Sequence, residues 1–175
     1  MKIITAFIAA TASLASGYGL AAAHLLSTKK TVVIDASAAK IWDVAKSFDG
    51  LNAWHPAVAT DEIIKGKNDT AGAVRLLTLK GGGTIKEELL SFDAAKRKFR
   101  YKILEGVLPV SDYRSAFVVT SVGKHEAAVT WTGWFKRKDL SDHPAPKEDD
   151  KTAIDTIGAV YQAGLDNLKK IVEAE

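Results

Sequence analysis

Residues 103–115, ILEGVLPVSDYRS, decide the fold of this chain, because they hold the end of one strand, a short turn and the start of the next strand. Gly106 and Pro109 mark the turn, and apolar residues lie on both sides of it. Similar runs lie outward along the chain. They predict strands at residues 31–34, 58–64, 73–79, 84–92, 98–104, 112–122 and 127–136. Turns this short between consecutive strands predict an antiparallel meander.

Two short helices and one long helix complete the predicted order. Ser37 can cap a first helix with apolar residues at helical spacing, and residues 51–54 form a second helical piece that Pro56 ends. Residues 140–151 are polar and read as a loop. The long helix begins near Asp149, and its apolar stripe is Ile154, Ile157, Tyr161, Leu165, Leu168 and Val172. This stripe predicts a helix laid across the sheet.

The N-terminus has the pattern of a secretory signal. Lys2 supplies a positive charge, residues 3–14 an apolar core, and residues 21–23 an Ala-rich cleavage site. We expect residues 1–23 to be a signal peptide and residues 24–175 a single domain located in the periplasm. An uncleaved membrane anchor is the alternative for the N-terminal segment, whereas the mature chain is not expected to span a membrane.

Composition excludes several classes of function. The net charge is only +3 and both signs are interleaved along the chain, so nucleic-acid binding has no support. There is no cysteine and hence no disulfide. The four histidines, His24, His55, His125 and His143, do not have metal-ligand spacing. We predict neither a metal site nor another cofactor.

Several short motifs in this order carry a family resemblance. They are residues 41–44 (IWDV), 48–49 (FD), 54–56 (WHP), 72–75 (GAVR), 87–89 (EEL) with Asp93, and 112–115 (DYRS). With them the chain resembles the SRPBCC superfamily, which includes START domains, Bet v 1-like proteins, polyketide cyclases and plant abscisic-acid receptors. The resemblance implies an α+β helix-grip fold. In that fold a curved antiparallel sheet of about seven strands wraps round a long C-terminal helix, with two short helices after the first strand.

Within the superfamily the chain is most similar to the MxaD-like group of small periplasmic proteins. That resemblance implies a non-enzymatic accessory role that supports methanol oxidation by aiding the interaction of methanol dehydrogenase with its cytochrome acceptor. A hydrophobic small-molecule cavity between sheet and helix is the structural feature of the fold. Two alternatives stay open: a carrier of lipid or aromatic molecules, and an enzyme resembling polyketide cyclases and dehydratases, with Glu87 paired with His55 or Tyr113. No motif fixes catalytic residues.

Candidate cavity residues follow from strand geometry and from the resemblance. On the strand over residues 84–92, Ile85, Glu87 and Leu89 share one face. The resemblance places Glu87 in the pocket; alternatively it points to solvent, or it pairs with Arg75 in a structural role. The resemblance also places Tyr113 and Ser115 on the pocket wall. The complete predicted ligand-binding set is Trp54, His55, Arg75, Ile85, Glu87, Leu89, Leu108, Tyr113, Ser115, Trp131, Ala159, Ala163 and Asn167.

Small residues mark one flank of the long helix. Ala159, Ala163 and Asn167 recur every four residues beside two glycines, which leaves space either for a cavity or for close packing of the sheet. Two turns, residues 80–83 and 106–109, correspond to the gate and latch loops of the plant receptors. The position of the lysine that holds the hormone carboxylate in those receptors is occupied by Ala59, so the resemblance does not extend to hormone-type acid recognition.

The last strand has aromatic residues on both faces. Trp131 and Phe135 point one way and Trp134 the other, so one face is core and the other presents an exposed aromatic that suggests a partner surface. Residues 136–138 (KRK) follow directly. They form either a solvated edge or a docking patch for an acidic protein.

Overall fold

The computed structural model describes residues 24–174, so the predicted signal peptide over residues 1–23 lies outside the described residues. The elements in chain order are β1 (Leu26–Ile34), α1 (Ala38–Ala45), α2 (Leu51–Trp54), β2 (Val58–Lys65), β3 (Val74–Leu79), β4 (Thr84–Asp93), β5 (Lys98–Gly106), β6 (Val110–Ser121), β7 (Ala127–Arg137) and α3 (Asp150–Ala174). This order confirms the predicted helix-grip fold: one antiparallel seven-stranded sheet, two short helices after β1, and a long C-terminal helix.

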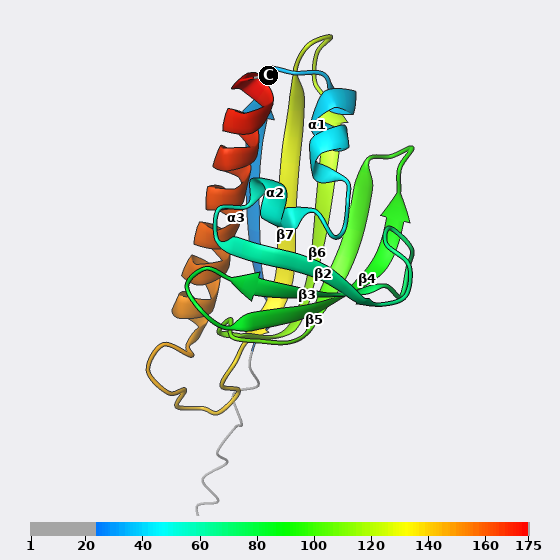
Figure 1. Cartoon of the computed structure of the whole chain (residues 1–175). Coiled ribbons are helices and arrows are strands. Elements are labelled where there is room, and N and C mark those ends of the chain that lie inside the picture. The colour runs from blue at the N-terminus through cyan, green and yellow to red at the C-terminus, as the bar shows by residue number, and fades with distance from the viewer. Residues whose placement is uncertain (1–23, 175) are drawn as a thin grey trace, which may run out of the picture.

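The seven strands lie in the order β1-β7-β6-β5-β4-β3-β2. Figure 1 shows α3 running beside β1 and β7, while β2 and β3 cross in front at an angle to the other strands. The two short helices carry the chain from β1, at one edge of the sheet, to β2 at the other. The sheet is therefore strongly curved, and its concave side faces the helices.

Strand β1 is longer than the predicted strand over residues 31–34. It begins at Leu26, because its backbone pairs with β7 as far as Leu26 opposite Phe135. The polar side chains in residues 27–30 hid this part of the strand from a search for apolar alternation. Thr28 is buried there, although it is polar.

Capping side chains fix the starts of two helices. The Ser37 side chain accepts a hydrogen bond of 3.2 Å from the Lys40 amide at the start of α1, as predicted. At the start of α3, the Asp149 carboxylate accepts one of 2.7 Å from the Thr152 amide. Both caps satisfy amides that have no partner within their own helix.

The predicted apolar stripe of α3 is confirmed at all positions but the first. Ile157, Leu165, Leu168 and Val172 are at most 1% exposed, whereas Ile154 is 39% exposed. Ala153 takes the inward position in the first turn, because it lies one helical repeat before Ile157. Tyr161, also in the stripe, is buried as well.

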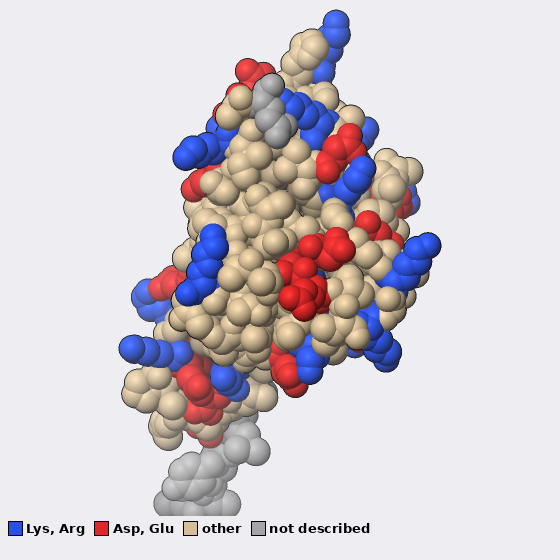
Figure 2. All heavy atoms as spheres, viewed as in Figure 1, with Lys and Arg blue, Asp and Glu red and all other residues tan. Residues whose placement is uncertain are grey.

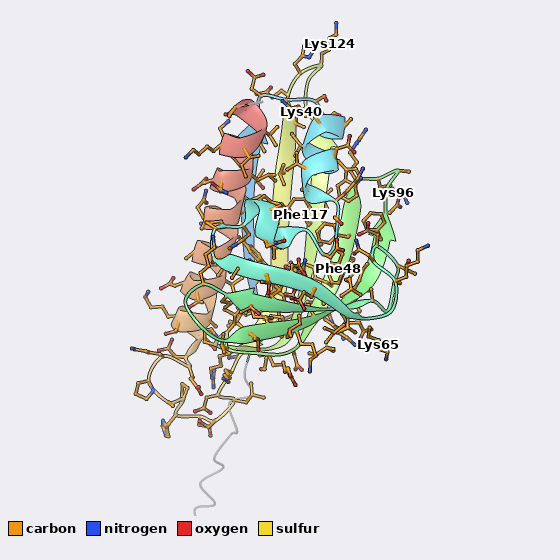
Figure 3. All side chains as sticks on the ribbon, viewed as in Figure 1. Lys40, Phe48, Lys65, Lys96, Phe117 and Lys124 are labelled. Atoms are coloured by element: carbon orange, nitrogen blue, oxygen red, sulfur yellow. The ribbon has the colours of Figure 1, made fainter. Side chains whose placement is uncertain are left out.

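Aromatic side chains fill the upper part of the core between the sheet and the short helices. Phe99 and Phe117 stack with ring centroids 5.1 Å apart, and Trp54 contacts Phe117 at 5.7 Å. In Figure 3, Phe48 and Phe117 lie inside the molecule, whereas Lys124 points outward from the turn between β6 and β7. These aromatic side chains form a packed core next to the cavity between the sheet and α3.

The face of the molecule shown in Figure 2 carries basic and acidic side chains in a mixed arrangement around uncharged areas. This agrees with the interleaved charges of the sequence. Within residues 24–174, every helix is too short or too polar to cross a bilayer.

Candidate functional site

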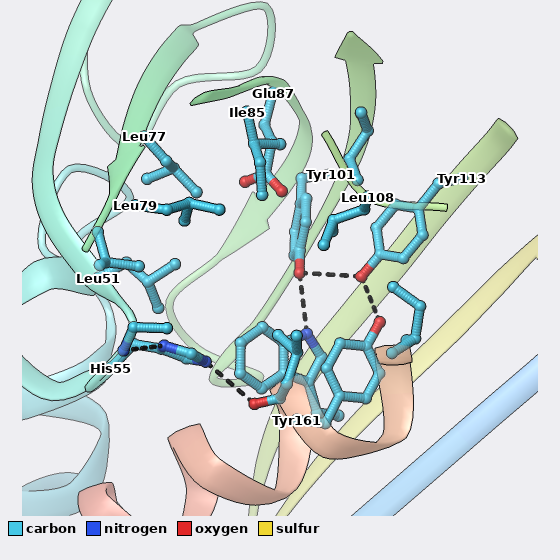
Figure 4. A pocket seen from close by; sticks show the side chains of 16 residues that line it. Leu51, His55, Leu77, Leu79, Ile85, Glu87, Tyr101, Leu108, Tyr113 and Tyr161 are labelled. Carbon is cyan, nitrogen blue, oxygen red and sulfur yellow. Dashed lines mark hydrogen bonds between the residues drawn. The ribbon is translucent and has the colours of Figure 1, made fainter. Parts of the chain in front are cut away.

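A cavity of about 70 Å³ lies between the concave face of the sheet and α3. Figure 4 shows its wall, to which β3, β4, β5, β6 and α3 contribute side chains. Six predicted residues lie on this wall: His55, Ile85, Glu87, Leu108, Tyr113 and Trp131. The alternation on β4 is confirmed, because Ile85, Glu87 and Leu89 are all buried.

The remaining wall residues were not predicted as site residues. They are Leu51, Ala57, Val58, Leu77, Leu79, Tyr101, Ile103, Ile157, Val160 and Tyr161. The signal for Tyr101 and Ile103 was present in the sequence, since both share a strand face with Phe99, which is buried. The signal for Tyr161 was its place in the apolar stripe of the long helix.

Three tyrosines meet at one end of the cavity. The Tyr113 hydroxyl lies 3.4 Å from the Tyr101 hydroxyl and is hydrogen-bonded to the Tyr161 hydroxyl. Trp131 donates its indole N–H to Tyr101 at 2.9 Å and to the Ser115 hydroxyl at 3.0 Å. Ser115 in turn donates to the Thr132 carbonyl at 2.9 Å. The polar atoms of this cluster satisfy one another.

Burial keeps these phenols neutral. It raises the pKa of Tyr101 to about 12 and raises the pKa values of Tyr113 and Tyr161 well above their usual value. Desolvation is the largest cause in each case, because it disfavours the phenolate. The tyrosines therefore act as neutral hydrogen-bonding groups at this end of the cavity.

Two glycines make room for the cluster. A Cβ at Gly133 would lie 2.5 Å from the Tyr161 hydroxyl, and a Cβ at Gly164 would lie 2.5 Å from Cδ2 of His55. Neither distance is tolerable for a side chain. Gly164 belongs to the small-residue flank noted in the sequence, and the structure shows that this glycine serves close packing.

His55 is held as one tautomer by two backbone groups. Its Nδ1 accepts from the Ala57 amide at 3.2 Å, so Nε2 carries the proton and donates to the Val160 carbonyl at 3.0 Å. Burial lowers the pKa of His55 below its usual 6.5. The imidazole is neutral near pH 7, and both of its nitrogens are engaged.

Glu87 reaches the cavity wall and is paired with Arg75 behind it. Oε2 of Glu87 lies 2.8 Å from Nε and 2.6 Å from Nη2 of Arg75, so both the pocket position and the alternative pairing are observed. The guanidinium also lies 4.2 Å from the Phe48 ring centroid and donates to the Phe48 carbonyl at 2.5 Å. Burial raises the pKa of Glu87, while the Arg75 charge opposes that rise.

Asp61 adds a second carboxylate to the same guanidinium. Its Oδ2 accepts from Nη1 of Arg75 at 3.2 Å and from the Leu51 amide at 3.0 Å. Within residues 24–174, Oδ1 is buried without a hydrogen-bond partner. Burial raises the pKa of Asp61. Glu87, Asp61 and Arg75 together form a buried cluster of two acidic groups and one cation behind the cavity.

Five predicted residues lie behind the wall and not on it. Leu89 and Trp54 are packed in the core, and Ser115 supports Trp131 and Tyr161. Arg75 holds Glu87, and Asn167 donates to the Trp54 carbonyl at 2.8 Å. These residues support the cavity wall from behind. Alternation in the sequence shows which face of a strand is buried, but it does not distinguish residues that line the cavity from residues that support its wall.

The prediction that Ala159 and Ala163 line the cavity is wrong. Both are exposed on the outer side of α3. Their four-residue spacing follows one helix face, but the face toward the cavity carries Ile157, Val160 and Tyr161. The small size of these side chains therefore did not indicate which face of α3 lies toward the cavity.

The two turns likened to gate and latch loops touch each other. A Cβ at Gly83 would lie 2.5 Å from a Val107 methyl, and the Val107 amide donates to the Thr84 carbonyl at 3.3 Å. Leu79 and Leu108, next to these turns, both line the cavity. The two turns therefore close one end of it.

The prediction that residues 136–138 form an exposed basic edge or patch is wrong for Arg137. It is only 8% exposed and donates to the Asp139 and Ser141 carbonyls at 2.6 Å each. It also forms an ion pair of 3.0 Å with Asp150 at the start of α3. Alternation along β7 turns Arg137 inward, so it anchors the loop before α3 and does not contribute a surface charge.

The chain is similar to known proteins in both sequence and fold. A family model described as polyketide cyclase/dehydrase and lipid transport matches residues 26–173. An uncharacterized protein of Bacillus thuringiensis is 26% identical with a TM-score of 0.73, over 84% of this chain and 98% of its own. Protein XoxI of Bacillus cereus has the same identity and TM-score, over 83% of this chain and 94% of its own.

A more distant structure shares the fold. The Zhui aromatase/cyclase of Streptomyces sp. R1128 is 18% identical with a TM-score of 0.68, over 86% of this chain and 94% of its own. A comparison with curated proteins finds no match. Because the family model spans nearly the whole chain and the neighbours share the helix-grip fold, this protein belongs to the polyketide cyclase/dehydrase and lipid transport family of the SRPBCC superfamily.

Proposed function

We propose that the chain is a non-enzymatic binding protein that takes a small, mainly apolar molecule into the cavity between its sheet and α3. The observation that carries the proposal is the state of the polar groups on the wall. Each candidate for acid–base chemistry is already engaged: Glu87 with Arg75, His55 with two backbone groups, and Tyr113 with Tyr161. In the described residues these groups already serve as hydrogen-bond partners within the wall, which favours binding over acid–base chemistry.

The size of the cavity supports a binding mode in which the wall opens. A volume of about 70 Å³ holds water or a few atoms, whereas an apolar cavity of about 150 Å³ is needed for benzene. Ligand pockets for larger molecules span roughly 300–1,000 Å³. A ligand therefore binds after side chains such as Leu79 and Leu108 move apart, and we expect slow association for this reason.

Titration calorimetry with octanol and 1-naphthol, two neutral probes, tests this function. Leu79→Phe fills the cavity and should weaken binding by about tenfold or more, because the ligand and the new ring compete for one space. Leu140→Phe is the matched control, since Leu140 is 48% exposed in the loop before α3. Equal binding by both variants, or chemical conversion of a probe seen by mass spectrometry, would contradict the proposal.

The accessory role in methanol oxidation is a second proposal for the same chain. In it the protein acts in the periplasm and brings methanol dehydrogenase and its cytochrome acceptor together. The observation that favours it is Trp134, which is 39% exposed on the side of the sheet away from α3. Exposed tryptophans beside arginines are frequent at the centres of protein interfaces.

Electron transfer from purified methanol dehydrogenase to its cytochrome tests the accessory role directly. The protein should raise the rate, and Trp134→Ala should remove most of that increase. Val33→Ala serves as the control, because Val33 is also exposed, at 44%, on β1. A rate unchanged by the wild-type protein would rule out this role without affecting the cavity proposal.

A further inference from the structure

The sheet opens between β5 and β6. Their pairing ends at Lys102 opposite Arg114, although β5 continues to Gly106 and β6 begins already at Val110. Each strand stays paired with its other neighbour: Gly106 lies opposite Ile85 of β4, and Val110 lies opposite Arg137 of β7. The strands therefore separate as a wedge, and we call this unpaired part of the sheet the seam.

Hollows lie on both sides of the seam. One outside hollow of about 720 Å³ and another of about 360 Å³ adjoin it, and the inner cavity lies behind it. Ile103 and Tyr113 line all three spaces. In Figure 4, Tyr113 and Leu108 stand at the edge of the cavity beside Tyr101. Side chains alone, without a backbone ladder, separate the cavity from the outside here.

The larger outside hollow is basic. Its lining contains Arg100, Lys102, Arg114 and Lys136, with Asp112 as the only acidic residue. Lys102 is paired with Glu88 at 3.1 Å and Lys136 with Asp112 at 2.8 Å. Among the carboxylates of residues 24–174, none forms an ion pair with Arg114 or Arg100. The two arginines are thus free to bind an anion.

Arg114 has a cationic neighbour across the sheet. It lies directly opposite Lys102 on β5, and like charges in this arrangement repel each other. Its other neighbour across the sheet is Trp134, which brings no negative charge. Glu88 beside Lys102 and Asp112 beside Arg114 offset part of this repulsion, and the two cations at the mouth of the unpaired seam match the head group of an anionic ligand.

We propose that the seam between β5 and β6 is the ligand portal, and that the ligand is an amphipathic molecule with one anionic head. Its apolar body passes Ile103 into the cavity, and its head stays outside on Arg114 and Lys102. This inference rests on the proposed binding function and adds to it the route and the chemical class of the ligand. A carboxylate head suits Arg114, whose guanidinium can bind two oxygens at once.

Three probes with the same chain and different heads test the ligand class: octanoate, octanol and octylammonium, titrated into the full protein in a calorimeter. Octanoate should bind about tenfold more tightly than octanol, because charge-assisted hydrogen bonds to the arginine add to apolar burial. Octylammonium should bind more weakly than octanol. Octyl phosphate, as a fourth probe, distinguishes a phosphate head from a carboxylate.

Variants at the seam test the route. Arg114→Gln should reduce the affinity for octanoate toward that for octanol, since Lys102 remains, and leave the affinity for octanol unchanged. Lys65→Gln is the control, because Lys65 is exposed on β2, an edge strand that β3 and β4 separate from β5. Ile103→Ala should speed association of both probes, and Ile103→Trp should slow it, so the two substitutions at one position give opposite effects.

Equal affinities for octanoate and octanol, with no effect of Arg114→Gln, would overturn the anionic head while leaving the cavity function in place. Unchanged association rates in both Ile103 variants would overturn the portal. If no probe binds at all, the binding function fails together with this inference.

Discussion

Strand β7 carries two tryptophans whose surroundings differ completely. Trp131 faces the cavity, stacks on Tyr161 with ring centroids 4.5 Å apart and gives its indole N–H to two acceptors. Trp134, three residues on, lies on the other face with Arg114 as its cross-strand neighbour. Most polar groups around the cavity have partners, with Oδ1 of Asp61 as an exception, whereas Arg100 and Arg114 on the outer face form no ion pair within residues 24–174. The difference separates residues that hold the fold from residues available for recognition.

The largest effect is expected from breaking the inner charge cluster. Arg75→Gln leaves Glu87 and Asp61 buried without their cation, and we expect a loss of about 3–5 kcal/mol in the free energy of unfolding. Urea denaturation of the full chain measures it. A loss below about 1 kcal/mol would mean that the two carboxylates are neutral, or that they find water, when Arg75 is removed.

Next in size is the docking of α3 on the sheet. Leu165→Ala should cost about 2–5 kcal/mol in the same measurement, because the side chain is fully buried. Ile154→Ala is the matched control from the first turn of the same helix. It should cost less than about 1 kcal/mol, since Ile154 is exposed. Similar losses in the two variants would contradict the observed orientation of α3.

An intermediate effect is expected from the tyrosine cluster at high pH. Folding raises the pKa of Tyr101 from near 10 in the unfolded chain to about 12. The neutral phenol therefore contributes fully to the free energy of unfolding below pH 10, and this contribution is lost as the pH rises toward 12. The free energy of unfolding should fall by about 2–3 kcal/mol across this range for that residue alone. Tyr101→Phe should flatten the dependence, and an unchanged slope would contradict the assignment.

The smallest effect is expected on the outer face. Arg114→Gln should leave stability unchanged or raise it by a few tenths of a kcal/mol, roughly, because it removes the repulsion from Lys102. Chemical denaturation of this variant beside Arg75→Gln compares two arginines of one sheet. A clear loss of stability at Arg114 would show that the outer residue has a structural role after all.

The fold could be predicted well because its signals are local. Strand alternation, the Ser37 cap and the apolar stripe of α3 each appear within a few residues of sequence, and the structure confirms them. The start of β1 was missed because it depends on pairing with β7, far along the chain. Local patterns do not report such partners.

The candidate site was predicted only in part, for a related reason. Strand periodicity correctly placed Ile85, Glu87 and Trp131 on the inner face, but it could not tell a wall residue from the layer behind it, as Leu89 and Ser115 show. The seam at Ile103 was also beyond reach. Both β5 and β6 look continuous in sequence, and their separation is visible only from the register of four neighbouring strands.

The pairing of the first strand with the last has a consequence for the order of folding. Thr31 and Thr130 are 99 positions apart in the chain, yet their hydroxyls share a hydrogen bond of 3.0 Å. The end of α3 then binds back to the start of the domain, where the Glu173 carboxylate accepts from the Asp35 amide at 2.9 Å. Neither contact can form before its distant partner, β7 or the end of α3, has been synthesised. The fold is therefore completed only when these late segments are present, and the many long-range contacts predict slow refolding for a domain of this size.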